Sequence, residues 1–187
     1  MPFNLFIVGV GGQGVITLAE IFRGLCLDNA IQCTGSILKG GAQRLGTVQA
    51  SLRLFLEPTP DYRNYSVEIP DGRLDLMIAL EPWEGLRFSR LCSAHSRVVI
   101  NSAVVPLMLE RTHPQGFGDP VSKMSRFGIE LMARNFTDES LRDHGSKKML
   151  NYAMGKFAVS NCLPFFTTQQ FDKRFEARTG VSRESRQ

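Results

Sequence analysis

Cysteine and histidine are scarce in this chain, and neither is arranged as a set of metal ligands. The 187 residues include four cysteines and three histidines. The cysteines form no CxxC pair and stand at Cys26, Cys33, Cys92 and Cys162. This spacing matches no iron–sulfur ligand pattern, and the histidines form no HExxH-type zinc site. We therefore expect no metal ligands in this chain and four reduced thiols.

Long apolar runs are missing as well. Nothing approaches the roughly 18 consecutive apolar residues that a transmembrane helix needs. The first strand is expected to begin at about Phe3, which leaves no room for a charged leader segment. We expect a cytoplasmic protein that does not bind a membrane.

Charge of one sign is not concentrated anywhere in the first two thirds of the chain. The net charge is +4 at pH 7, and the basic residues are scattered. A nucleic-acid surface would need clustered Lys and Arg with interleaved aromatic residues, so nucleic-acid binding is not expected. The modest positive excess favours an anionic ligand or an acidic partner.

The apolar residues that are present alternate between strand and helix patterns. Strands are expected at residues 3–8, 31–37, 48–55, 66–69, 74–80, 97–101 and 129–135. Helices are expected at residues 15–28, 81–91, 138–144, 147–160 and 168–178. Residues 48–55 alternate apolar and polar side chains, which favours a half-buried, antiparallel strand. Residues 111–126 have no period and form the longest expected loop, a candidate partner-facing segment.

Strands alternating with helices indicate an α/β fold. We expect a Rossmann-like three-layer sandwich with a mostly parallel sheet, which residues 48–55 would make mixed. A single domain is expected over residues 1–181, and the tail of residues 182–187 is expected to be disordered.

A glycine-rich turn, "GVGGQG", follows the first strand at residues 9–14. Gly9 permits the tight turn, Gly11 lets the backbone approach a pyrophosphate, and Gly14 allows the next helix to pack closely on the strand. The helix expected to begin at Val15 would offer free N–H groups to a phosphate. This order of strand, turn and helix predicts phosphate binding; the alternative is a turn that only packs.

The acidic residue that identifies an NAD site is missing. A dinucleotide site expects Asp or Glu about 20 residues after the turn, at the end of the second strand. Residues 31–38 contain no acidic residue, and the chain continues instead into Lys39, two glycines and Arg44. Cations beside flexible backbone suit a phosphate better than a ribose diol.

Two longer stretches are more specific than the glycine pattern. "GVGGQGVITLAEIF" and "GSILKGGAQRLGTVQASLRL" resemble the gamma-type domain of the 2-oxoacid:ferredoxin oxidoreductases, most closely the small (beta) subunit of indolepyruvate ferredoxin oxidoreductase. The resemblance continues through "LDLMIALEPWEGLR", "RVVINSAVVP" and "NYAMGKFAVSNCLP", which extends it over nearly the whole chain. Two departures leave the 2-oxo acid open. "QRLG" at residues 43–46 stands where the family usually has Gln-Arg-Gly-Gly, and "KG" at residues 39–40 where it commonly has His-Gly.

The resemblance implies a division of labour between two subunits. A large partner would hold thiamine diphosphate, Mg and iron–sulfur clusters, decarboxylate a 2-oxo acid and pass electrons to ferredoxin. The gamma-type domain would close over the active site and contribute to binding of CoA. This chain would then be a small oxidoreductase subunit, inactive alone. Aryl-pyruvate substrates are favoured, with indolepyruvate, phenylpyruvate, phenylglyoxylate and branched-chain acids all open. The alternative is a stand-alone Rossmann-like nucleotide-binding protein, regulatory or NAD(P)-dependent.

The candidate ligand-binding residues lie in the two glycine-rich loops and at one strand end. They are Gly9, Gly11, Gly12, Gln13, Gly14, Lys39, Gln43, Arg44 and Asn101. CoA carries a pyrophosphate that suits the glycine turn and a ribose 3′-phosphate that would attract Lys39 or Arg44. For Arg44 the alternative is a structural ion pair, and for Gln13 a cap on the following helix.

Two carboxylates also stand at an expected strand end. Glu81 and Glu84 follow the strand at residues 74–80, at the edge where such sheets usually bind ligands. Alternatively, Glu84 and Arg87 pair on one helix, since they are three residues apart. Asn151 is expected to serve helix packing. No nucleophile–base pair is evident, so we expect no catalytic residue in this chain.

Overall fold

The computed structural model of the chain describes residues 1–40, 46–105 and 118–181. These residues build a six-stranded sheet with the strand order β2-β3-β1-β4-β5-β6. The strands are β1 (Phe3–Val10), β2 (Gln32–Lys39), β3 (Thr47–Phe55), β4 (Leu74–Ala79), β5 (Cys92–Asn101) and β6 (Glu130–Arg134).

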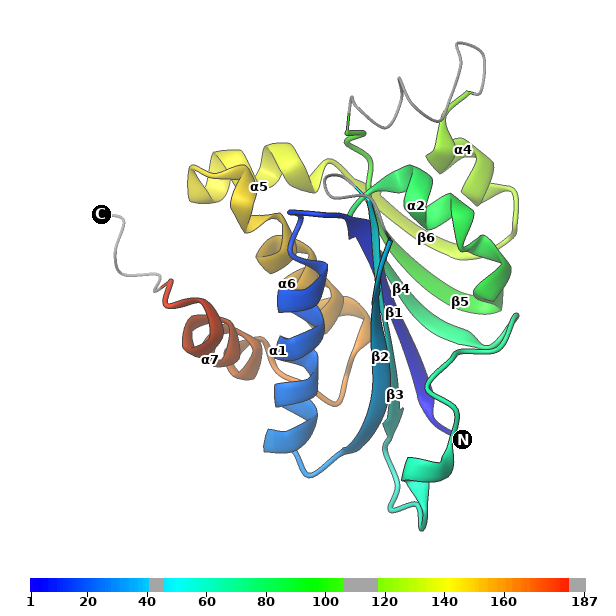
Figure 1. The fold of residues 1–187 in the computed structure, drawn as a ribbon. Coiled ribbons are helices and arrows are strands. Elements are labelled where there is room, and N and C mark those ends of the chain that lie inside the picture. Colours follow the sequence, from blue (N-terminus) through cyan, green and yellow to red (C-terminus); the bar gives the residue numbers. More distant parts are fainter. Residues whose placement is uncertain (41–45, 106–117, 182–187) are drawn as a thin grey trace.

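Helices cover both faces of this sheet (Figure 1). One face carries α1 (Val15–Asp28), α6 (Leu150–Cys162) and α7 (Thr168–Thr179), with α5 (Phe136–His144) at its upper end in the figure. The other face carries α2 (Pro82–Arg87) and α4 (Pro120–Ser125). Short 3₁₀ turns are η1 (Tyr62–Asn64), η2 (Ser89–Leu91) and η3 (Lys147–Met149). The predicted three-layer α/β architecture is confirmed.

Strand β3 runs against both of its neighbours. It pairs antiparallel with β1 and with β2, whereas β1, β4, β5 and β6 pair in parallel. The mostly parallel, mixed sheet predicted from the alternation in residues 48–55 is therefore confirmed. Because two reversals restore the direction, β2 runs the same way as β1 and ends at the same edge of the sheet.

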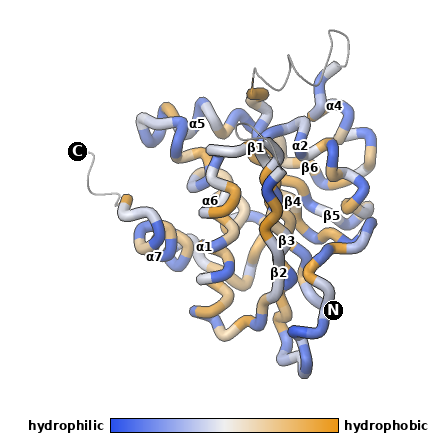
Figure 2. Tube along the Cα trace, in the orientation of Figure 1, coloured by the Kyte–Doolittle hydropathy of each residue, from blue (hydrophilic) through white to orange (hydrophobic). Residues whose placement is uncertain are grey.

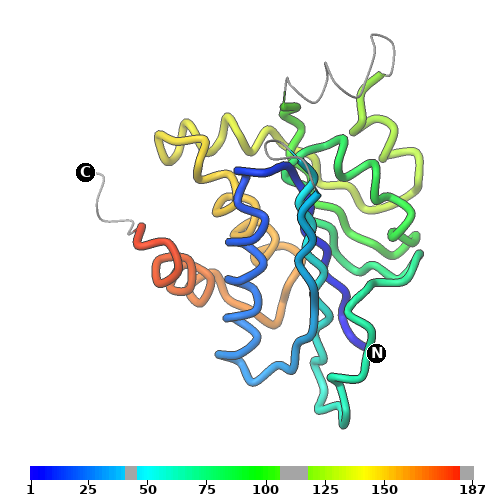
Figure 3. Tube along the Cα trace, in the orientation of Figure 1, coloured from blue at the N-terminus to red at the C-terminus, as the bar shows by residue number. Residues whose placement is uncertain are grey.

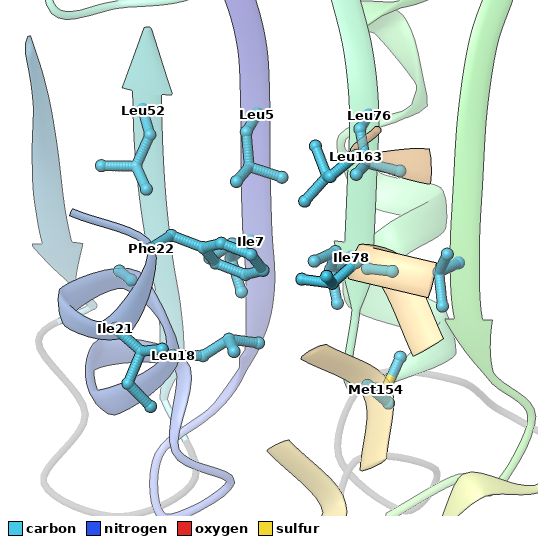
Figure 4. Packing of buried hydrophobic residues seen from close by; sticks show 14 of the residues in the cluster. Leu5, Ile7, Leu18, Ile21, Phe22, Leu52, Leu76, Ile78, Met154 and Leu163 are labelled. Carbon is cyan, nitrogen blue, oxygen red and sulfur yellow. The ribbon is translucent and has the colours of Figure 1, made fainter. Parts of the chain in front are cut away.

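The central strand β1 is buried on both faces. Leu5 and Ile7 pack in the cluster beneath α1, with Phe22 (Figure 4), while Phe6 and Val8 pack in the cluster on the α2 side. Figure 2 shows the same pattern as apolar strands between amphipathic helices. Burying one such side chain stabilises the fold by about 1.5–3 kcal/mol, so burial on both faces keeps β1 at the centre.

Helix α7 returns to the outer side of α1, although the two lie near opposite ends of the chain (Figure 3). A capping box of Thr167 and Gln170 begins α7. Phe171 then packs on Phe22 with ring centroids 5.9 Å apart, and Arg174 forms an ion pair with Asp28. The C-terminal helix thus adds its phenylalanine side chains to the core cluster from the side of α1 and α6.

Residues 66–69, expected to be a strand, form none. Their backbone groups are bonded by side chains of β3 instead of by a neighbouring strand. The hydroxyl of Ser51 donates to the Val67 carbonyl oxygen at 2.7 Å, and the Arg53 guanidinium donates to that of Ser66 at 2.8 Å. The segment therefore crosses the face of the sheet without joining it.

Two other expectations need correction. The helix expected over residues 81–91 ends at Arg87 and continues only as the 3₁₀ turn η2. Within the expected loop of residues 111–126, Pro120–Ser125 is a helix. Asp119 accepts hydrogen bonds from two backbone N–H groups of its first turn. An Asp N-cap followed by Pro at the first position favours a helix even without an apolar period.

The expected disordered tail, residues 182–187, lies outside the described residues. Within the part of the chain that the structure describes, no helix is both long and apolar enough to cross a membrane.

Candidate functional site

The carboxyl ends of β1, β4, β5 and β6 lie at one edge of the sheet, the upper edge in Figure 1. In open α/β sheets this edge is where ligands bind. β1 continues through Gly9 and Val10, which pair with β3, so the expectation that Gly9 forms the tight turn is wrong and the turn itself is residues 11–14. Glu81 follows β4 at the same edge, and Asn101 ends β5. The fold therefore brings together three of the segments that the sequence analysis singled out.

Gln13 holds the glycine turn in shape from inside. Its side-chain Oε1 accepts a hydrogen bond from the Val10 N–H at 2.8 Å, and its Nε2 donates to the Leu80 carbonyl oxygen at 3.1 Å. Gly9 leaves room for the Gln13 side chain, because a Cβ at position 9 would lie 2.7 Å from Gln13 Oε1. The Gln13 amide thus ties the end of β1 to the end of β4. Its predicted contact with a ligand stays a prediction.

Asn101 is a second buried side chain that connects elements at the same edge through hydrogen bonds. Its Nδ2 donates to the Leu80 carbonyl oxygen at 3.1 Å and to Thr137 Oγ1 at 3.0 Å. Its Oδ1 accepts from the N–H groups of Ala103 and Thr137, each at 3.4 Å. Asn101 therefore joins β4, β5 and α5 and supports the site from below, whereas direct ligand contact by Asn101 remains a prediction.

Helix α1 begins at the rim of this edge. Gly14 precedes it with φ +87° and ψ +23°, a left-handed conformation that favours glycine. No described side chain caps the helix, and its first turn carries no acidic residue. The first N–H groups of α1 are thus suited to an anion, since they have no carbonyl partner within the helix.

A pocket of about 360 Å³ opens directly beside the glycine turn. Gly12 and Gln13 line one side of it, and residues 103–105 line another. The remaining wall includes Thr137 of α5 and the exposed lysines Lys147 and Lys148 of η3. This pocket combines backbone of the phosphate-type turn with two positive charges.

Lys147 and Lys148 were missed in the sequence analysis, which placed them in an ordinary helix. The sequence signal that could have identified these lysines is their position as a pair directly before a buried helix in an α/β chain. That pattern also fits a solvated helix face, and only the fold brings η3 to Gly12.

Lys39 stands at the same edge but farther from the glycine turn. Lys39 is opposite Val48, and Val48 is opposite Gly9, so two strand spacings of about 4.8 Å each separate Lys39 from Gly9. The side chain of Lys39 is exposed. Gln43 and Arg44, the other predicted residues of that loop, lie outside the described residues.

The position of β3 also changes the argument about NAD. The missing acidic residue was sought at the end of β2, on the premise that the second strand adjoins the first. β3 occupies that place, so a side chain at the end of β2 would be about 10 Å from β1. This order of strands differs from the dinucleotide-binding order, in which the second strand neighbours the first.

Two buried carboxyl groups follow β4 at the same edge of the sheet. Neither Glu81 nor Glu84 exposes any surface, and Glu81 Oε2 accepts from the Glu84 N–H at 2.8 Å, which caps α2. Burial raises the pKa of Glu81 to about 7, although the hydrogen bond from the Glu84 N–H lowers it. Burial also raises the pKa of Glu84, although Arg87 lies 3.5 Å away and lowers it. The Glu84–Arg87 pair, given above as the alternative for Glu84, is present.

The described residues bring no three His, Cys, Asp or Glu side chains together as a metal site. Asn151, expected to serve helix packing, is buried on α6, and a Cβ on Gly14 would lie 2.4 Å from its Nδ2. That expectation is confirmed.

A family model described as pyruvate ferredoxin/flavodoxin oxidoreductase matches residues 4–180. The chain belongs to this family. Its curated relatives include the indolepyruvate oxidoreductase subunit IorB of Methanothermobacter thermautotrophicus, 33% identical over 116 residues, which are 61% of this chain and 56% of that protein. The IorB of Archaeoglobus fulgidus is 33% identical over 102 residues, or 54% of this chain and 47% of that protein. This chain thus matches about half the length of these relatives.

Solved structures of the oxidoreductase family share the fold. The gamma subunit of a keto/oxoacid ferredoxin oxidoreductase from Geobacter sulfurreducens has a TM-score of 0.63 and 16% identity, over 94% of this chain and 86% of that one. The pyruvate oxidoreductase subunit PORC of Thermotoga maritima has a TM-score of 0.64 and 14% identity, over 94% and 84%. The 2-oxoglutarate:ferredoxin oxidoreductase of Magnetococcus marinus, a structure with coenzyme A bound, has a TM-score of 0.58 and 13% identity, over 97% and 32%.

Proposed function

We propose that this chain is the small subunit of a thiamine-dependent 2-oxoacid:ferredoxin oxidoreductase, with aryl-pyruvate substrates favoured. Membership of the oxidoreductase family carries this proposal, and the names of the two IorB relatives favour indolepyruvate. A large partner subunit would hold thiamine diphosphate, Mg and the iron–sulfur clusters, and would pass electrons to ferredoxin. The described residues bring no three His, Cys, Asp or Glu side chains together, which supports assigning the iron–sulfur clusters to the partner.

Within that enzyme, this chain would bind CoA at the pocket beside the glycine turn and help to close the active site. Backbone N–H groups at the start of α1 and the side chains of Lys147 and Lys148 would face the pyrophosphate of CoA. Lys39 is better placed for the ribose 3′-phosphate, since it lies about 10 Å from Gly9 along the same edge. Arg44 is the other candidate for that contact.

The first test is dependence on a partner. Expressed alone, the chain should be colourless and should not turn over any 2-oxo acid. Co-expressed with a large subunit that carries cluster cysteines, it should yield a brown complex that reduces a viologen dye with indolepyruvate and CoA under anaerobic conditions. A colourless monomer that turns over a 2-oxo acid unaided would disprove the proposal.

The second test separates the two phosphate contacts by comparing CoA with dephospho-CoA in the assembled enzyme. Lys147→Ala and Lys148→Ala should each lower the affinity for CoA and for dephospho-CoA by the same factor. For the lysine that contacts the pyrophosphate, this factor should be roughly 10- to 150-fold. Lys39→Ala should mainly narrow the preference for CoA over dephospho-CoA.

Lys173→Ala, on the exposed surface of α7, is the matched control and should change neither affinity. If Lys147→Ala and Lys148→Ala both bind CoA as the wild type does, the pocket is not the pyrophosphate site. Micromolar binding of NADH at the same pocket would instead favour the stand-alone nucleotide-binding protein.

A further inference from the structure

Two of the four cysteines lie against each other, away from the candidate ligand site. Cys26 is in the last turn of α1 and is 1% exposed, while Cys33 is half-buried near the start of β2. Cys26 lies in the core cluster beneath α1 and Cys33 packs against that cluster, and each thiol shifts the pKa of the other. Both cysteines are free, so the fold holds a pair of neighbouring thiols.

The connection between α1 and β2 explains why these thiols meet. The chain leaves α1 in a tight turn in which the Ile31 N–H donates to the Cys26 carbonyl oxygen at 2.8 Å. Side chains of a strand alternate between its two faces, so Ile31, Cys33 and Ile37 share one face. All three pack against the core cluster that contains Cys26. Cys33 therefore faces the side of β2 on which α1 and Cys26 lie.

The two thiols differ in reactivity. Cys33 is half-buried, whereas Cys26 is 1% exposed, so an oxidant reaches Cys33 first. The neighbouring Cys26 thiol and the positive charge of Arg23 also lower the pKa of Cys33, which favours its thiolate, while Cys33 and burial raise the pKa of Cys26. A thiolate is the form that attacks oxidants, so we take Cys33 as the nucleophile and Cys26 as the thiol that attacks it afterwards.

The other two cysteines lack this arrangement. Burial raises the pKa of Cys92 to about 11, and burial also raises the pKa of Cys162. Cys92 sits at the start of β5 and is half-buried like Cys33, which makes it an internal control of similar access.

We propose that Cys26 and Cys33 form a reversible disulfide when the protein meets hydrogen peroxide. The Cys33 thiolate attacks one peroxide oxygen, the O–O bond breaks, and the departing hydroxide takes up a proton to become water, which leaves Cys33 as a sulfenic acid. The Cys26 sulfur then attacks the Cys33 sulfur, the S–O bond breaks, and a second water leaves with the proton of Cys26. The two thiols lose two electrons to the peroxide, and a dithiol such as dithiothreitol restores them.

The disulfide would covalently link the end of α1 to the edge strand β2. Because a crosslink restricts the unfolded chain, the oxidised protein should melt at a temperature several degrees higher than the reduced protein. The expected site of oxidation can be read directly, since trypsin cleavage after Arg23 and Lys39 releases residues 24–39, a peptide with both cysteines and no others.

The test treats the full chain with one equivalent of hydrogen peroxide, unfolds it in urea so that buried thiols become accessible, blocks the remaining thiols with iodoacetamide and analyses the tryptic peptides by mass spectrometry. The peptide of residues 24–39 should be lighter by two hydrogen atoms and carry no alkyl group. If the oxidised protein is treated with dithiothreitol before the iodoacetamide step, the peptide of residues 24–39 should carry two alkyl groups. The peptide that contains Cys92 should be alkylated in both samples.

Cys33→Ser should leave Cys26 alkylated after peroxide, and Cys26→Ala should leave Cys33 as a sulfenic acid that dimedone traps. Cys92→Ser should form the disulfide as the wild type does. The proposal is overturned if the wild-type peptide keeps both alkyl groups after peroxide, or if Cys33 oxidises to sulfinic acid while Cys26 stays a thiol. A folded Cys33→Ser protein whose thermal midpoint rises equally on oxidation would also overturn it.

Discussion

Between pH 5 and pH 8 the wild-type chain should lose up to about 3 kcal/mol of its free energy of unfolding through Glu81, and the Glu81→Gln variant should not. Burial raises the pKa of Glu81 from 4.5 to about 7 in the folded state. In that pH window the unfolded chain releases the proton while the folded chain retains it. Stability therefore falls as pH rises and levels off above the folded pKa.

Glutamine suits this test because it keeps the shape of the side chain and an oxygen that can cap α2 by accepting from the Glu84 N–H. Glutamine does not titrate, so the stability of the Glu81→Gln variant should vary less with pH. Glu84, whose pKa is raised as well, contributes a slope to both proteins, so the difference between them reports Glu81 together with its electrostatic interaction with Glu84.

The measurement is urea unfolding of both proteins at several pH values, with Glu57→Gln as the control. Glu57 is exposed, and its replacement should leave the pH profile of the wild type unchanged. Parallel profiles for wild type and Glu81→Gln would show that Glu81 ionises in the folded protein at its ordinary pKa.

Periodicity predicted the elements well where local pattern decides the structure. The expected helix of residues 15–28 is α1 with the same bounds, and the alternation in residues 48–55 predicted the antiparallel β3. Residues 66–69 have the composition of a strand, but a strand also needs a neighbour with which to pair. β3 satisfies their carbonyl groups through the side chains of Ser51 and Arg53, which local pattern does not reveal.

The order of strands could not be deduced from local pattern either, because pairing joins residues far apart in the chain. The comparison with NAD sites assumed that β2 adjoins β1, whereas β3 lies between them. For the same reason Lys147 and Lys148 were overlooked. Their chemistry was visible in the sequence, but their place opposite Gly12 depends on how α5 and η3 cross the carboxyl edge.

Gly14→Ala should lower the free energy of unfolding by about 2–5 kcal/mol, and Gly12→Ala by only about 1–2 kcal/mol. Both glycines have positive φ, +87° and +94°, so alanine is strained at either position. A Cβ on Gly14 would also lie 2.4 Å from Asn151 Nδ2, whereas nothing lies within 4 Å of a Cβ on Gly12. The difference between the two variants therefore measures the contact between the start of α1 and α6.

A double-mutant cycle isolates most of that contact, because Asn151→Ala removes the Nδ2 and Cγ atoms at 2.4 and 2.9 Å, leaves the Cβ at 3.2 Å and does not alter the strained backbone. Asn151→Ala should destabilise the wild type, since the Asn151 side chain is buried and accepts a hydrogen bond from the Tyr152 N–H at 2.9 Å. In the Gly14→Ala background the same change should cost less, or restore stability. Additive effects would mean that Asn151 can turn away freely and that backbone strain alone makes position 14 a glycine. The methyl group of Gly12→Ala enters the proposed CoA pocket, so that variant should reduce CoA affinity in the assembled enzyme although it remains the more stable of the two.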